Sequence, residues 1–191
     1  PISDFTPCDN GHSGKLPQGW CNCKISDVSI SLLGKTLDRG KNTGNLKKYL
    51  CAVNVKWGTF ELSTVKEMPI EATELERYSV KFGDLMVCEG GDVGRAAIWT
   101  YNSKMYYQNA LHRIRFKENI SAHYFLYSLM CLKLIGVIDD VCKGVTIKHL
   151  TQNAMNTLKF NLPPIAEQQR IVQKIEELFS ILDNIQNALE V

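Results

Sequence analysis

The sequence predicts an α+β protein, in which a β-rich body is followed by one long C-terminal helix that forms a coiled coil. Three observations predict this fold class. Short apolar runs separated by turn residues fill much of residues 16–120, a pattern typical of strands. Residues 121–138 open with Ser121 and are dense in apolar residues at helical spacing, which predicts a mostly buried helix. Residues 163–191 keep an apolar repeat that no earlier segment keeps.

The first part of the body is irregular before it becomes β-rich. Residues 1–15 are polar and rich in turn formers, and we expect an irregular lead-in segment. Short β-type runs surround Ile25, Val28 and Ile30. Residues 34–45 combine glycines, hydroxyls and positive charges, a composition that indicates a loop.

More strands and a second short helix follow along the body. We expect strands at residues 49–55 and 58–65, a turn followed by a buried strand over 80–88, and strands at 96–100 and 110–116. After the helix at 121–138, the pattern predicts a loop, a short helix at 148–155 and a strand at 157–162.

A pair of prolines marks the predicted boundary between a body of residues 1–162 and a helix of residues 163–191. Pro163 and Pro164 push the residues before them away from helical geometry, whereas proline itself suits the first helical turn. Glu167 then lies near the positive end of the helix. The pair therefore separates the last strand from the helix.

The C-terminal helix carries a narrow apolar seam with steps of 4, 3, 4, 3 and 4 residues, typical of a coiled coil: Ile171, Ile175, Leu178, Leu182, Ile185 and Leu189. Over roughly 25 residues the helix would extend about 37 Å, long for one face of such a body to cover. The alternative, a helix folded onto its own body, stays open. Because the chain has no second such helix, we expect dimerisation through this seam.

Charge is divided unevenly along the chain. Residues 1–162 hold 20 Lys and Arg against 15 Asp and Glu, or +5, whereas residues 163–191 hold 2 against 5, or −3. Outside residues 61–76, which hold five Glu and one Lys, the body has 19 against 10, or +9. Such a body can hold a polyanion, although many solvated surfaces are as basic.

The seven cysteines are odd in number and scattered, which favours reduced thiols and a cytoplasmic location. His12, Cys21 and Cys23, with Cys8, could suggest zinc, but their spacing matches no paired motif, and we expect no metal. No apolar run is long enough for a membrane helix, and residues 1–20 lack the apolar stretch of a signal peptide.

No motif in the sequence supplies catalysis. The stretch EGGDVGR, residues 89–95, has glycines but no G-K-[ST] ending, and a strand rather than a helix follows it, so turn glycines are the better interpretation. The four histidines lie far apart, and "NLPPI" (residues 161–165) departs from the tetrapeptide of DNA amino-methyltransferases. We therefore expect no catalytic residue and no cofactor in this chain.

Several segments, in this order, resemble the specificity subunit of type I restriction-modification systems: "LPQGW", "RYSVKFGDLMV", "GDVGRAAIW", "YYQNALHRIRF" and "KGVTIKHLTQNAMNTLKFNLPPIAEQQRIVQKIEEL". The resemblance runs from about Leu16 to Asn187, and its most specific part is "LPPIAEQQRIVQKI".

The resemblance implies a non-catalytic, DNA-binding subunit. Members of the family usually carry two target recognition domains, each followed by a long helix, and the helices pair antiparallel as a spacer. Each domain reads one half of a split sequence in double-stranded DNA. The subunit positions methyltransferase subunits, which bind S-adenosylmethionine, and a motor-nuclease subunit joins for cleavage. This chain has one such domain and one helix, so it is a half-size subunit or a piece of a longer one.

Base reading uses Arg, Lys, Asn or Gln near a groove, and phosphate binding uses positive or hydroxyl groups. Residues of these types gather in predicted loops and turns, where ordinary solvated charge is the alternative: Lys35, Thr36, Arg39, Lys41, Asn42, Lys56, Arg95, Gln108, Asn109, Lys143, Thr146 and Lys148. Trp57 and Tyr107 could stack on DNA, although packing in the protein is the more ordinary role.

Two other functions stay open. The chain could be the recognition domain of an enzyme that fuses restriction and methyltransferase activities in one polypeptide. It could also be a coiled-coil oligomerisation adaptor that never binds DNA. Steep salt dependence of DNA binding would separate the adaptor from a DNA reader.

Overall fold

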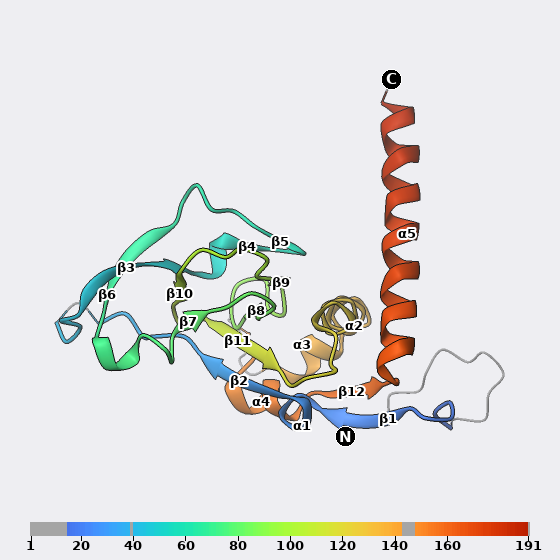
Figure 1. Ribbon diagram of the computed structural model, residues 1–191, viewed down its shortest axis with the longest axis horizontal. Coiled ribbons are helices and arrows are strands. Elements are labelled where there is room, and N and C mark those ends of the chain that lie inside the picture. The colour runs from blue at the N-terminus through green and yellow to red at the C-terminus, as the bar shows by residue number, and fades with distance from the viewer. Residues whose placement is uncertain (1–14, 39, 143–147, 191) are drawn as a thin grey trace.

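The computed structural model describes residues 15–38, 40–142 and 148–190. It has a β-rich body, a group of helices beside it and one long helix that points away from both (Figure 1). The strands are β1 (Cys21–Lys24), β2 (Ser29–Leu33), β3 (Asn45–Leu50), β4 (Val55–Lys56), β5 (Thr59–Phe60), β6 (Lys66–Ile70), β7 (Ser79–Val80), β8 (Leu85–Cys88), β9 (Ala96–Ile98), β10 (Met105–Tyr107), β11 (Leu111–Phe116) and β12 (Lys159–Leu162). The helices are α1 (Ile25–Val28), α2 (Ala122–Leu134), α3 (Val137–Val141), α4 (Gln152–Thr157) and α5 (Ile165–Leu189), with 3₁₀ turns at Ala52–Asn54 and Ala72–Glu74.

Two four-stranded sheets form the centre of the body. One has the order β2-β11-β8-β9 and is antiparallel throughout. The other has the order β6-β3-β10-β7, with β10 parallel to β3. β4 pairs with β5, and β1 pairs with β12 across almost the whole length of the body sequence. The α+β class predicted from the sequence is confirmed.

The strand β8, with the sequence LMVC, is apolar throughout because both of its faces are buried. Leu85 and Val87 point to one face of their sheet and join a core cluster that includes Phe125 of α2 and Ile138 of α3. Met86 and Cys88 point to the other face and join a cluster with strands of the second sheet. A strand buried on both faces lacks the alternation of a half-exposed strand.

Several predicted strands were wrong in extent or kind. The run around Ile25 and Val28 contains the helical turn α1, because the Asp27 carboxylate accepts a hydrogen bond from the Lys24 N–H (2.8 Å) and the Ser29 hydroxyl donates to the Ile25 carbonyl (2.7 Å). The predicted strand at 58–65 is reduced to β5, and the one at 49–55 is broken by a 3₁₀ turn. β6 and β10 were not predicted.

Capping residues determine where the helices α2 and α4 begin. The hydroxyl of Ser121 accepts from the Tyr124 N–H (3.2 Å), so α2 begins where the sequence predicts, but it ends before Gly136, which has φ +84°. The short helix predicted at 148–155 is α4, displaced toward the C-terminus because Thr151 caps it through the Ala154 N–H (3.3 Å).

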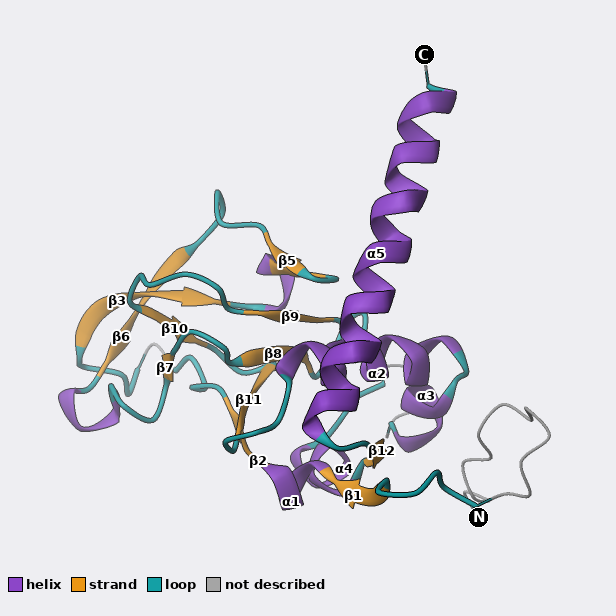
Figure 2. Ribbon diagram, turned by 45° about the vertical axis from the view of Figure 1, so that its right-hand side comes forward, coloured by secondary structure: helices purple, strands orange, loops and turns teal. Residues whose placement is uncertain are grey.

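The helix α5 begins directly after the two prolines, as predicted, and is anchored by one buried glutamine. The Gln168 amide donates to the Pro163 carbonyl (2.9 Å) and accepts from the Ser121 N–H (2.9 Å), which ties the first turn to the start of α2. From there the helix leaves the body, and its C-terminal end stands far from every other element (Figures 1 and 2). No helix in the described part of the chain is both long and apolar enough to cross a lipid bilayer.

Candidate nucleic-acid interface

The loop between β2 and β3, residues 34–44, is held tightly at both ends by glycines. A Cβ at Gly34 would lie 2.3 Å from the carbonyl carbon of Gln108, and a Cβ at Gly44 would lie 2.0 Å from the carbonyl oxygen of Ile70. Both positions therefore require glycine. The loop therefore leaves the body at two fixed points.

A buried ion-pair cluster locks the same loop. The Lys35 ammonium lies 2.7 Å from a Glu71 carboxylate oxygen and also pairs closely with Glu74, and its side chain is only 6% exposed. Glu71 also accepts from the Thr43 N–H (3.0 Å), so one carboxylate holds both ends of the loop. The hydrogen bond from Lys35, together with contacts to Glu74 and Thr43, lowers the pKa of Glu71 to about 2.

The cluster gives Lys35 an internal role. Burial alone would lower the pKa of Lys35, but its hydrogen bonds to Glu71 and Glu74 outweigh this effect and raise it. Its ammonium group forms ion pairs with both carboxylates. The predicted contact of Lys35 with DNA is therefore not open to it in this conformation, and we assign Lys35 to positioning the loop.

Backbone hydrogen bonds bring four segments with predicted DNA-binding residues side by side. The Asn109 N–H donates to Lys35 O (3.0 Å), the Glu89 N–H donates to Ala110 O (2.9 Å), and the Leu150 N–H donates to Glu89 O (2.8 Å). These contacts join residues 34–44, 89–95, 108–110 and 148–150, which we name the loop edge. Nothing in the sequence showed that these segments would meet.

The predicted residues of the loop edge differ in how free their side chains are. Lys41 is 86% exposed, with only a distant pairing to Asp38 (3.6 Å), and Lys148 is 49% exposed at 3.6 Å from Asp139. Thr36 is exposed, whereas Gln108, Asn109 and Asn42 are half-buried. Arg39, Lys143 and Thr146 lie outside the described residues. Their predicted contacts, like those of the free residues, stay predictions.

Two predicted residues have other surroundings. The Arg95 guanidinium donates to the Ala52 carbonyl (2.9 Å) and lies 3.5 Å from Asp92, so it links the turn after β8 to the 3₁₀ turn at Ala52–Asn54. Lys56 is exposed on the β4-β5 hairpin, outside the hydrogen bonds that join the loop edge. Trp57 packs against the core, and Tyr107 is fully buried.

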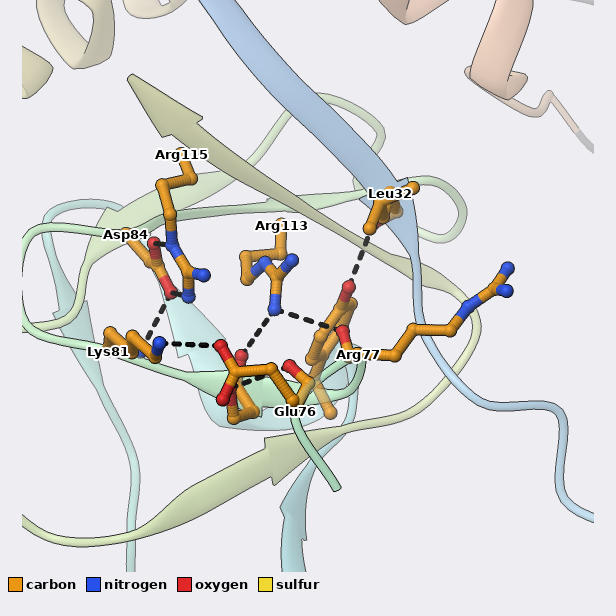
Figure 3. Close-up of polar contacts among 9 residues, drawn as sticks. Leu32, Glu76, Arg77, Lys81, Asp84, Arg113 and Arg115 are labelled. Carbon is orange, nitrogen blue, oxygen red and sulfur yellow. Dashed lines mark hydrogen bonds and ion pairs between the residues drawn. The ribbon is translucent and has the colours of Figure 1, made fainter. Parts of the chain in front are cut away.

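A polar network extends from two arginines of β11 (Figure 3). Arg115 binds Asp84 through two hydrogen bonds of 2.7 Å each. The buried Arg113 donates to the carbonyls of Arg77 (3.0 Å) and Ser79 (2.6 Å). These contacts hold the segment between β6 and β8 against β11 of the sheet β2-β11-β8-β9.

Arg77 is a cation that the sequence analysis missed. Its side chain is exposed, extends away from the network in Figure 3 and forms no ion pair within the described part of the chain. The centre of the Tyr78 ring lies 5.5 Å from the Arg77 guanidinium and 5.7 Å from the Lys35 ammonium. Arg77 thus borders the loop edge. The sequence analysis overlooked Arg77 because it ends the acidic stretch "EATELER" (residues 71–77).

The helix α5 carries a second surface, an exposed apolar strip. Ile171 packs against the core with Val172, and Ile175 is half-buried. The remaining four seam residues are exposed, the last of them most: Leu178 48%, Leu182 58%, Ile185 52% and Leu189 77%.

The seam and the body-facing side of α5 are different faces of the helix. Gln168, Val172 and Phe179 face the body, and the Phe179 ring lies 6.0 Å from that of Tyr127 of α2. At about 100° per residue, the seam is rotated by roughly 80° from this side. The body therefore leaves most of the seam uncovered.

Comparisons with known proteins agree with this architecture. The sequence model of a family described as the type I restriction modification DNA specificity domain matches residues 17–191. The chain belongs to this family. Within the described residues, no three side chains of His, Cys, Asp or Glu gather as a metal site, and Cys8 and His12 lie outside the described part.

Individual specificity subunits match the chain over most or part of its length. The StySPI specificity subunit of Salmonella potsdam is 21% identical over 185 residues, covering 93% of this chain and 40% of the relative. The EcoBI specificity subunit of Escherichia coli is 28% identical over 115 residues, covering 60% of this chain and 24% of the relative. The chain thus spans less than half the length of these relatives.

Solved structures show the same fold. The HsdS subunit from Thermoanaerobacter tengcongensis has a TM-score of 0.68 at 17% identity, covering 91% of this chain and 40% of that one. A chain from a study of assembly and conformational transition of the type I R-M system has a TM-score of 0.71 at 16% identity, with coverages of 98% and 44%.

Proposed function

We propose that this chain reads one half of a split DNA target and pairs, through α5, with the helix of a second recognition domain. The uncovered strip on α5 carries this proposal, because four large apolar residues stand in solvent at coiled-coil spacing. A rigid helix pair holds two readers at a fixed separation, which flexible linkers cannot do.

The charges of α5 support antiparallel pairing. Arg170 and Lys174 are its only Lys and Arg residues and lie near its start with Glu167, whereas Glu176, Glu177 and Asp183 follow them from the middle of the helix onward. In an antiparallel pair of identical helices, the acidic segment of each helix lies beside the segment of the other that carries Arg170 and Lys174. In a parallel pair, the two acidic segments lie side by side and repel each other. Two paired copies would read a symmetric split target.

The chain itself performs no chemistry in this proposal. It binds double-stranded DNA through the loop edge and positions methyltransferase subunits, which supply the S-adenosylmethionine site, and a motor-nuclease subunit joins for cleavage. The exposed cations Lys41, Lys148 and Arg77 hold phosphates or base edges. This assignment follows from their exposure and from the family.

The test uses the chain assembled with methyltransferase subunits. Mapping of methylated sites should give a target of two short half-sites separated by a fixed spacer. DNA binding should weaken steeply as salt rises, since phosphate contacts release counterions. A continuous target would contradict pairing, and salt-independent behaviour without competition by DNA would favour the oligomerisation adaptor.

A further inference from the structure

The carboxylate of Glu89 is unlike the other carboxylates of the body. Among the described residues of the body, six carboxylate side chains, including that of Glu89, are buried or half-buried. The other five form ion pairs: Asp38, Glu71, Glu74, Asp84 and Asp139. Glu89 is the sixth, and its side chain makes no hydrogen bond or ion pair with any described residue. A half-buried carboxylate without a donor is an unusual and costly arrangement.

The backbone of Glu89 is held in place from two sides. Its N–H donates to Ala110 O (2.9 Å), directly after the predicted readers Gln108 and Asn109, and its carbonyl accepts from Leu150 (2.8 Å). The next residue, Gly90, packs so closely on His149 that a Cβ there would lie 3.4 Å from the ring. The backbone that carries this carboxylate is therefore fixed within the loop edge.

Burial raises the pKa of Glu89, and the nearby His149 only partly opposes this effect. The charged form is therefore short of stabilising donors. A ligand that donates a hydrogen bond would restore them. On a surface that binds DNA, phosphates repel a carboxylate, so the donor must belong to a base.

We propose that Glu89 reads a cytosine by accepting a hydrogen bond from its N4 amino group in the major groove. Adenine also presents an amino donor there, but its N7 acceptor lies beside that donor and would repel the carboxylate, whereas cytosine presents the N4 donor without it. The half-target then contains a C·G pair at the position facing Glu89. This inference rests on the proposed DNA-reading function.

The experiment compares Glu89→Ala with the wild-type chain, both assembled with methyltransferase subunits. Methylated sites are mapped, and binding is measured to duplexes changed at one base pair at a time. The wild type should prefer C·G at one position by about 5- to 150-fold. Glu89→Ala should lose that preference at this position alone and keep the others.

The matched control is Glu67→Ala, which removes an exposed carboxylate from β6 and should leave the target unchanged. Because Glu89 contributes only backbone hydrogen bonds among the described residues, Glu89→Ala should unfold like the wild type. If it does not, Glu89→Gln keeps the side-chain volume and should move the preference at this position from cytosine toward adenine, since an amide pairs with adenine N6 and N7. An unchanged target in a folded variant would overturn the assignment. A wild-type assembly without any sequence preference would instead overturn the proposed function.

Discussion

The loop edge and the helix α5 present opposite kinds of surface. At the loop edge, most charged groups near the backbone are already paired: Lys35 with Glu71 and Glu74, and Arg95 with Ala52 and Asp92. On α5, by contrast, the seam residues beyond Ile175 have no covering group within the described residues. The loop edge is built by contacts inside the chain, and the seam is completed only by contact with another helix.

Substitutions in the seam should therefore have the largest effect on self-association while leaving the body folded. Leu178→Asp combined with Leu182→Asp should weaken self-association at least 100-fold, because two buried leucines contribute roughly 3 to 6 kcal/mol and charges are costly in a coiled-coil seam. Sedimentation equilibrium measures the association. Circular dichroism and thermal unfolding should show an intact body, since both leucines are about half exposed.

A matched double variant controls for charge. Gln173→Asp with Asn184→Asp adds the same two charges on the opposite face of α5, where both side chains are exposed. This variant should associate like the wild type. A wild-type chain that stays monomeric would contradict pairing with a second copy, and unfolding of the body by the leucine changes would show that the helix belongs to its core.

This contrast also explains which structural features could be predicted from the sequence alone. The seam depends on a local repeat, so the position of α5 and its start after Pro164 could be predicted from neighbouring residues. The role of Lys35 depends on Glu71 and Glu74, far along the chain, in an acidic segment that the charge analysis had set apart from the basic body. Pairing across that distance cannot be predicted from composition, and it reduces the free positive charge of the body.

The loop edge can be tested by comparing two lysines of one loop. Lys35→Met leaves Glu71 and Glu74 without their cation and should lower the free energy of unfolding by about 1.5 to 3 kcal/mol, the range for hydrogen bonds to charged groups. Lys41→Met, at a residue 86% exposed, should leave stability almost unchanged and weaken DNA binding instead. Urea unfolding and DNA titration distinguish them, and equal losses of stability would refute the positioning role of Lys35.

The smallest expected effect is a pH dependence of the same cluster. The pKa of Glu71 is lowered to about 2 from an ordinary value of 4.5, with the Lys35 hydrogen bond as the main cause. A carboxyl whose pKa is lower in the folded state stabilises the fold fully above its unfolded pKa, and this contribution is lost as pH falls toward the folded pKa. The stability difference between wild type and Glu71→Gln should therefore be constant above about pH 5 and shrink between roughly pH 4.5 and 2. In a Lys35→Met background most of this pH dependence should vanish, because the main cause of the lowered pKa is gone. An unchanged pH profile in that background would show that Glu74 and the Thr43 N–H, rather than Lys35, hold the charge of Glu71.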